Sequence, residues 1–132
     1  MAKLIGSVDQ LGRPLVRLRL AGPNSEDFLA LVDTGFNGHL MMGSQTAKTL
    51  GVELTGDATT VELGNGASTS VYQGFTEVHW LGRSSRAQVL ASSSWVVRNP
   101  DAPVALVGTG LLRPHLLLVD FESATVEIET TS

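Results

Sequence analysis

The chain has 132 residues, 42% of them hydrophobic and none of them cysteine, so it is long enough to bury a core and too short for two ordinary domains. Nine Lys and Arg against thirteen Asp and Glu give a net charge of -4, which leaves no general basic field for nucleic acid or anionic lipid. Without cysteine, disulfides, iron–sulfur clusters, thiolate zinc sites and cysteine nucleophiles are excluded. We expect a single domain spanning residues 1–132.

The amino-terminal segment is not typical of a secretory signal, because Asp9 comes before any long apolar run develops. Eighteen consecutive apolar residues occur nowhere, since even the most apolar segment stops at Asp120. The sequence therefore predicts a soluble, cytoplasmic protein with neither a membrane partner nor a nucleic-acid partner.

Short segments rich in Val, Leu, Thr and Ile recur between turn signals, which predicts a mostly β domain with closed or sandwiched sheets. Strands are expected at residues 4–8 and 14–20, joined by a turn at residues 9–13. In the second strand apolar residues alternate with arginines, which indicates one buried face and one solvent-exposed face. Residues 28–32 are apolar on both faces and end abruptly at Asp33-Thr34-Gly35. This pattern is typical of a central strand that is followed by a turn of unusual backbone conformation.

The middle of the chain predicts one helix and one long hairpin. Residues 40–42 can form a short strand, and Ser44 can cap a helix over residues 45–50 that Gly51 closes. The Asn-Gly pair within Gly64-Asn65-Gly66 is the strongest hairpin signal in the sequence. Residues 61–63 and 70–72 are expected to flank this pair in a long hairpin, with the second arm continuing through 75–80 to a turn at 81–85 and a returning strand at 88–90.

The carboxyl-terminal third predicts an irregular loop followed by more strands. The loop covers residues 92–103, which are rich in serine and contain two prolines. A buried strand is expected at 104–107, about one helical turn at 109–113, and a final hairpin that pairs 116–121 with 125–129.

The most informative chemical signal is Asp33-Thr34-Gly35 at the end of the apolar strand. A buried strand can deliver a carboxylate to the floor of a cleft, and glycine then allows a backbone path that a Cβ would obstruct. A second segment, Leu106-Val107-Gly108, has the pattern apolar–apolar–glycine and places its glycine 75 residues after Asp33. Between the two lies the Asn-Gly hairpin, which is suited to cover such a cleft.

These features resemble the retropepsin-like aspartic proteases, including single-domain bacterial members. The resemblance covers residues 28–121, and the closing hairpin also looks like that of pepsin-like lobes. It rests on Ala30-Leu31-Val32-Asp33-Thr34-Gly35, on Gly64-Asn65-Gly66, and on Ala105-Leu106-Val107-Gly108-Thr109-Gly110-Leu111-Leu112. It implies a closed β-barrel of the acid protease fold, with one or two short helices and a flap hairpin.

The resemblance also implies roles for individual residues. Asp33 would be the catalytic aspartate, Thr34 would supply a hydroxyl that braces the pair of acids, and Gly35 would keep the turn tight. Gly108 would end the strand that crosses the catalytic loop. The residues expected to bind substrate are Phe36, Asn37, Gly64, Asn65, Gly66, Val104 and Leu106.

The chain departs from the retroviral pattern at two places. Thr109-Gly110 stands where retroviral members often carry Arg followed by Asp or Asn, so an ion pair that stiffens the retroviral dimer is missing. Phe36-Asn37-Gly38 stands where retroviral enzymes commonly offer acidic residues to the substrate backbone. Substrate preference therefore cannot be carried over from them.

One Asp-Thr-Gly per chain sets a requirement on assembly. Hydrolysis of this kind needs two carboxylates that share one proton, so the second must come from Asp33 of an identical chain across a two-fold axis. The sequence thus predicts a homodimeric aspartic endopeptidase that binds an extended peptide as an added strand. No cofactor is expected.

Several simpler interpretations stay open. Asp33 can be an Asx-turn acid that merely ends a strand, and Gly64-Asn65-Gly66 can be an ordinary surface hairpin. The chain can also be a non-catalytic dimerisation or peptide-binding module on the same fold, or a protease for one partner only. His39, His79 and His115 lack metal-ligand spacing, so no metal site is expected.

Overall fold

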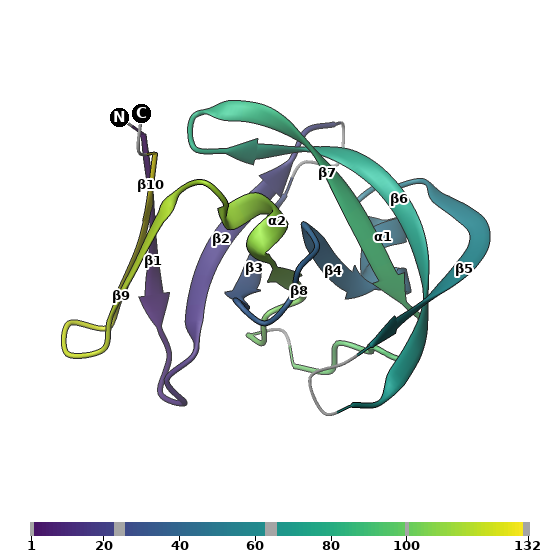
Figure 1. Cartoon of the computed structure of the whole chain (residues 1–132), viewed down its shortest axis with the longest axis horizontal. Coiled ribbons are helices and arrows are strands. Elements are labelled where there is room, and N and C mark those ends of the chain that lie inside the picture. Colours follow the sequence, from purple (N-terminus) through teal and green to yellow (C-terminus); the bar gives the residue numbers. More distant parts are fainter. Residues whose placement is uncertain (1, 23–25, 63–65, 100, 131–132) are drawn as a thin grey trace.

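The computed structural model describes residues 2–22, 26–62, 66–99 and 101–130. These residues form ten strands and two short helices (Figure 1). The strands are β1 (Lys3–Val8), β2 (Pro14–Leu20), β3 (Asp27–Val32), β4 (Leu40–Gly43), β5 (Leu54–Glu62), β6 (Ser68–Trp80), β7 (Arg83–Ser92), β8 (Ala105–Val107), β9 (Leu116–Asp120) and β10 (Thr125–Glu129); the helices are α1 (Ser44–Thr49) and α2 (Thr109–Leu112).

Six of the strands close into a barrel. Hydrogen-bonded neighbours follow the order β5-β6-β7-β4-β8-β3-β2-β1-β10-β9, and an additional pairing of β6 with β2 closes the ring of β2, β3, β8, β4, β7 and β6. β5 extends the ring beside β6, while β1, β10 and β9 form a flank on one side of the barrel (Figure 1). The predicted mostly β, closed-barrel fold with two short helices is confirmed.

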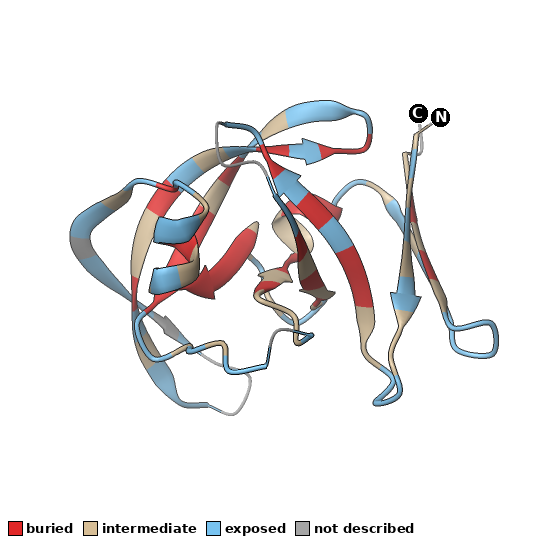
Figure 2. Cartoon of the chain, turned by 180° about the vertical axis from the view of Figure 1, so that it is seen from behind, coloured by how far each residue is buried: buried red, intermediate tan, exposed pale blue. Residues whose placement is uncertain are grey.

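The core fills the inside of the barrel because side chains alternate between its two faces. In β3, Phe28, Ala30 and Val32 are buried, whereas Leu29 and Leu31 are only partly buried. Buried positions also occur along the other barrel strands (Figure 2), and in the short strand β4 all four residues are buried. This packing fixes the register of β3, and with it the place where the strand ends.

The short strand β8 lies between β3 and β4. It runs parallel to β3, with Val32 opposite Val107, and antiparallel to β4, with Leu40 opposite Val107. Because β8 ends at Val107, the segment that begins at Gly108 starts beside the residue that follows β3. That residue is Asp33.

The β6–β7 hairpin is longer than the sequence predicted. Its turn contains only Leu81 and Gly82, both with positive φ (51° and 82°), and Trp80 pairs directly with Arg83. Such a turn matches the twist of the strands that it joins, so the strand pairing begins at once. The predicted turn at 81–85 was wrong because the serines after Gly82 belong to β7.

Two other local predictions were wrong. Ser44 is not the N-cap of α1 but its first residue; Gly43 holds the N-cap position, and the cap has no side-chain hydrogen bond. Gly43 lies against the Trp95 carbonyl, where a Cβ would collide. β5 covers Leu54–Glu62, and the pattern identified only its last residues next to the hairpin tip, because the described side chains along it are mostly exposed.

The β1–β2 turn at residues 9–13 is organised by the Asp9 carboxylate. Oδ1 accepts the backbone N–H groups of Arg13 and Leu11 at 2.9 and 3.0 Å, and Oδ2 accepts Arg13 Nε at 2.7 Å. Gly12 completes the turn with φ +80°. The backbone N–H of Arg13 contributes most to lowering the pKa of Asp9, with the Arg13 side chain and the Leu11 N–H acting in the same direction.

A lowered pKa in the folded state makes the contribution of Asp9 to stability depend on pH. The contribution is complete above the ordinary aspartate pKa of about 4 and is lost as pH falls through the lower folded value. We therefore expect Asp9→Asn to lower the free energy of unfolding at neutral pH, and the gap to wild type to shrink at about pH 3. Urea unfolding of both proteins across this range measures it, and a constant gap would contradict the assignment.

Candidate active site

Asp33 is placed by the pairing of β3 with β8. Its backbone N–H donates to the Val107 carbonyl at 2.9 Å, which continues the parallel ladder one step beyond the end of β3. The Asp33 side chain is partly buried, whereas the next two residues, Thr34 and Gly35, are exposed. The strand thus presents a carboxylate at the edge of the barrel.

The turn after Asp33 fixes this carboxylate. Asp33 Oδ1 accepts the Gly35 N–H at 2.9 Å, and the Asp33 carbonyl accepts the Phe36 N–H at 3.2 Å. A Cβ on Gly35 would lie 3.3 Å from Asp33 Oδ1, which is tighter than most Cβ contacts. Glycine at this position therefore lets the backbone amide approach the acid.

The loop after the turn is held by the segment that follows β8. Thr109 donates to the Phe36 carbonyl from its backbone N–H at 2.8 Å and from Oγ1 at 3.3 Å. Gly108 N–H donates to the His39 carbonyl, and Gly110 N–H donates to the Gly38 carbonyl, each at 3.0 Å. Four hydrogen bonds therefore join two segments that are about 70 residues apart in sequence.

The glycines in the second segment are required by this close approach. A Cβ on Gly108 would collide with the carbonyl oxygens of Phe36 and Gly38, and one on Gly110 would collide with the His39 ring. The sequence resemblance implied that Gly108 ends an apolar strand; in the structure β8 ends at Val107, and Gly108 follows it as the N-cap of α2. Thr109-Gly110, the departure from the retroviral pattern, contributes three of the four hydrogen bonds.

No protein-family model and no curated protein matches this chain in sequence. Among solved structures, a retropepsin-like aspartic protease from Rickettsia conorii matches with a TM-score of 0.68 at 16% identity, over 97% of this chain and 90% of that one. The EIAV protease in complex with the inhibitor HBY-793 matches with a TM-score of 0.56 at 17% identity, over 80% and 89% of the two chains. This chain has the retropepsin-like fold. The fold implied by the sequence resemblance is thus confirmed.

Within the retropepsin-like fold, Phe36 and Leu106 come together. Both pack against a buried cluster of Met41, Val71 and Leu90 on the outer side of the barrel wall. The Phe36 ring occupies the space left by Gly38 and Gly108, since a Cβ on either glycine would contact it within 2.6 Å. Phe36 therefore packs within the loop, a role in addition to the substrate contact that the sequence suggested.

The other predicted substrate contacts are more scattered. Asn37 is exposed beside this cluster. Val104 donates its N–H to the Leu29 carbonyl at 2.8 Å, which places it about 13 Å from Asp33 along β3 at 3.3 Å per residue. In the hairpin, Gly66 has φ +84°, while Gly64 and Asn65 lie outside the described residues.

Sequence analysis missed the role of His39 because it examined the histidines only as metal ligands. His39 Nδ1 accepts the Gln88 backbone N–H at 2.9 Å, and its carbonyl accepts the Gly108 N–H. The residue therefore ties the loop after Asp33 to both β7 and the second glycine segment. No local sequence pattern marks such a contact, since His39 and Gln88 are 49 residues apart.

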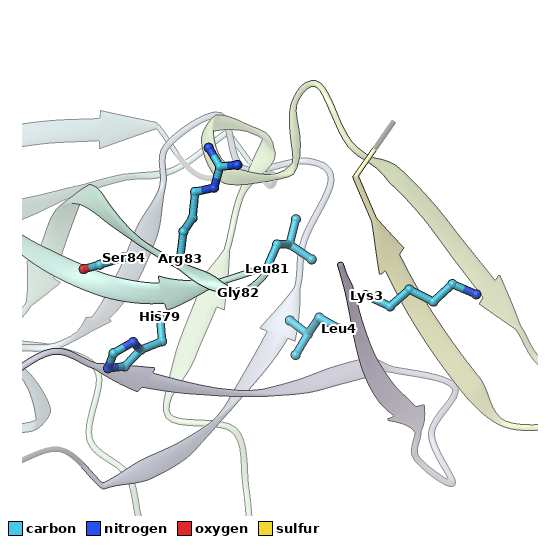
Figure 3. A pocket seen from close by; sticks show the side chains of 7 residues that line it. All are labelled: Lys3, Leu4, His79, Leu81, Gly82, Arg83 and Ser84. Carbon is cyan, nitrogen blue, oxygen red and sulfur yellow. The ribbon is translucent and has the colours of Figure 1, made fainter. Parts of the chain in front are cut away.

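A hollow lies at the β6–β7 turn. It has a volume of about 470 Å³ and is lined by Lys3, Leu4, His79, Leu81, Gly82, Arg83 and Ser84. Its basic side chains point in different directions, and Lys3 points away from the other two (Figure 3). They do not converge on one point as an anion site requires.

The described part of the chain contains no group of three or more His, Asp or Glu residues that could hold a metal ion. It also contains no helix with the length and hydropathy needed to cross a membrane.

Gly108→Ala should destabilise the fold by about 2–4 kcal/mol, because the new methyl group meets backbone carbonyls that cannot move independently of the loop. Urea unfolding measures the change. Gly56→Ala is the matched control, because a Cβ there meets nothing within 4 Å. Equal stability of the two variants would contradict the proposed close approach.

His39→Leu should lower the free energy of unfolding by about 1–3 kcal/mol, because the Gln88 N–H loses its acceptor in a partly buried position. Chemical unfolding again provides the measurement. His79→Leu replaces an exposed histidine on β6 and should change stability by less than about 0.5 kcal/mol. If both variants were equally mild, the Gln88 contact would contribute nothing to stability.

Proposed function

We propose that this protein is a homodimeric aspartic endopeptidase. The observation that carries the proposal is the Asp33 carboxylate, partly exposed at the end of a buried strand and oriented by the Gly35 N–H at 2.9 Å. The R. conorii protein, which matches over nearly the whole chain, is described as a retropepsin-like aspartic protease. Fold and carboxylate together support peptide hydrolysis as the activity.

The assembly follows from the number of such acids. The chain contains one Asp-Thr-Gly, whereas this chemistry needs two carboxylates close enough to share a proton. A two-fold axis between two copies supplies the second Asp33 without a second motif in the chain. The exposed Thr34 lies next to Asp33 on the same turn, so its hydroxyl is available to brace the pair.

The reaction divides the work between the two carboxylates. The ionised Asp33 accepts a proton from water as the water oxygen bonds to the peptide carbonyl carbon. The protonated Asp33 of the other copy donates its proton to the carbonyl oxygen, giving a neutral tetrahedral intermediate. The first Asp33, which now holds the proton from water, donates it to the amide nitrogen, and the second Asp33 accepts a proton from a hydroxyl of the intermediate. The carbon–nitrogen bond breaks, a carboxylic acid and an amine are released, and the pair of acids returns to its starting state.

The substrate is proposed to be an extended peptide lying between the β5–β6 hairpin and the floor around Asp33. Main-chain hydrogen bonds would hold it as an added strand beside the hairpin. Phe36, Leu106 and Val104 offer apolar contacts, and exposed Asn37 offers a neutral amide to the peptide backbone. Such a floor favours apolar over charged side chains in the peptide.

Asp33→Asn should lower the rate of casein cleavage by about 10²–10⁴-fold. Each copy supplies one Asp33, so the substitution removes both carboxylates of the pair. The assay should run from mildly acidic to neutral pH. At higher pH the pair of acids loses the proton that it shares, and at lower pH it binds a second proton. Circular dichroism and unfolding curves check that the variant stays folded.

Asp27→Asn is the matched control, because Asp27 is exposed at the opposite end of the same strand. It should cleave casein at the wild-type rate. Full activity of Asp33→Asn would remove the proposal. Saturable peptide binding without cleavage by the wild-type protein, at every pH, would instead identify the non-catalytic peptide-binding module.

A further inference from the structure

A row of apolar side chains crosses the outer face of the barrel wall over four neighbouring strands. Leu31 of β3 lies opposite Leu106 of β8, Leu106 opposite Met41 of β4, and Met41 opposite Leu90 of β7. Opposite residues in neighbouring strands share a face. Asp33 continues the ladder of β3 by one step, so its side chain lies on the same face as Leu31, two residues earlier. The row therefore begins beside the proposed catalytic acid.

The far end of this row is covered by Trp95, a residue that belongs to no recognised motif of the sequence. Trp95, Phe36 and Leu106 pack against one buried cluster, which consists of Met41, Val71 and Leu90. All three are only partly buried, so each keeps surface that another molecule can contact. Phe36 and Leu106 are already predicted to contact the peptide. Trp95 adds an aromatic side chain to the same apolar surface.

The backbone around Trp95 is tied to the ends of β4 and β7. Its N–H donates to the Ser92 carbonyl at 3.4 Å, and its carbonyl lies against Gly43, where a Cβ would collide. Gly43 and Ser92 are themselves paired. Ser92 Oγ accepts the Ser94 N–H at 3.3 Å, which closes the turn before Trp95. The indole is therefore held at a fixed place, although it lies in a loop and takes no part in strand pairing.

The hairpin beside which the peptide is proposed to lie reaches the same place. Val71 belongs to the cluster under Trp95, and it lies on β6, where it pairs with Thr59 of β5. A peptide added as a strand beside this hairpin would therefore pass over the apolar row and meet Trp95.

The distance from Asp33 identifies which peptide residue Trp95 would meet. β4 and β7, which carry Met41 and Leu90, are two and three strands away from β3. At about 4.8 Å between neighbouring strands, the cluster lies about 10–14 Å from the strand that ends at Asp33. An extended peptide covers this distance in three or four residues, at about 3.3 Å per residue.

We propose that Trp95 is a specificity-determining residue that binds an aromatic side chain of the peptide, three or four residues from the cleaved bond. The rings of Trp95 and Phe36 and the thioether of Met41 all favour an aromatic partner, because ring–ring and sulfur–ring contacts add to the burial of apolar area. Each copy of the dimer supplies one Trp95, so one such position lies on either side of the bond.

This inference deepens the proposed function and rests on it for the path of the peptide. It adds a substrate class, namely peptides with aromatic residues at a distance from the point of cleavage. It also gives a role to the loop between β7 and β8, which the sequence analysis treated as irregular.

The first test maps cleavage sites by mass spectrometry in a peptide library prepared by tryptic digestion of denatured proteins. Sites cut by the wild-type protein should be enriched at least about threefold in Phe, Tyr and Trp, three or four residues from the cleaved bond. Trp95→Ala should lose this enrichment, and Trp95→Phe should keep most of it. An enrichment that is missing in wild type, or unchanged in Trp95→Ala, would overturn the proposal.

The second test separates specificity from damage to the fold. It uses two peptides from the library that differ only in Phe or Ala at the distal position. Trp95→Ala should raise KM for the Phe peptide about tenfold and leave kcat/KM for the Ala peptide unchanged. Val96→Ala is the matched control, because Val96 is the next residue of the loop and is 63% exposed; it should keep the preference for Phe. Equal losses on both peptides would show a merely structural role for Trp95.

A binding experiment separates this inference from the proposed function. The chain has two tryptophans, and Trp80 Nε1 has no hydrogen-bond partner among the described residues, so Trp80→Phe leaves Trp95 as the only indole without deleting such a bond. In this protein with Asp33→Asn added, an octapeptide with Phe at both ends should shift Trp95 emission to shorter wavelength. It should also bind about tenfold more tightly than the same peptide with Ala at both ends.

The two proposals then fail in different ways. Binding of this kind by a protein whose wild-type form never cleaves peptides would reject the hydrolysis and support the contact with Trp95. Cleavage by wild type, combined with equal affinity for the two octapeptides and no change in Trp95 emission, would support the hydrolysis and overturn the role of Trp95.

Discussion

The carbonyl oxygens of Phe36, Gly38 and His39 accept hydrogen bonds from the amides of residues 108–110, and this contact sets the position of the rest of the site. It requires β8 to lie between β3 and β4, and it leaves no room for a Cβ at Gly108 or Gly110. The Asp33 turn lies directly beside these bonds. The backbone is therefore hydrogen-bonded at both ends of the turn, by the Asp33 N–H to the Val107 carbonyl and by the Thr109 N–H to the Phe36 carbonyl, while the carboxylate itself accepts the Gly35 N–H.

The hydrogen bonds between residues 36–39 and 108–110 also distinguish residues that hold the loop in place from residues that would contact a peptide. Phe36 shows both roles, because its ring fills the space over Gly38 and Gly108 while its carbonyl accepts two hydrogen bonds from Thr109. Substitutions there would change loop packing and apolar contacts together. Asn37 is exposed and next to it, so it offers the cleaner position at which to change the proposed peptide contacts.

Sequence patterns predicted the parts of this structure that depend on local chemistry. An apolar run ending in Asp33, and the glycine at position 108, carry short signals, because burial and close backbone approach each demand particular residue types. The start of β5 and the role of His39 carry no such signal. β5 is held by pairing with β6 while its described side chains are mostly exposed, and His39 depends on a Gln88 amide that is distant in sequence. Long-range pairing cannot be read from a single chain.

The sequence distance across the site has a consequence for the order in which it forms. Phe36 and Thr109 are 73 residues apart, and contacts between distant residues form late because a long loop must first close. During synthesis, Asp33 leaves the ribosome long before the amides that fix its loop. The acid thus stays without its final hydrogen-bonded surroundings until most of the chain has been made and β8 has entered the sheet.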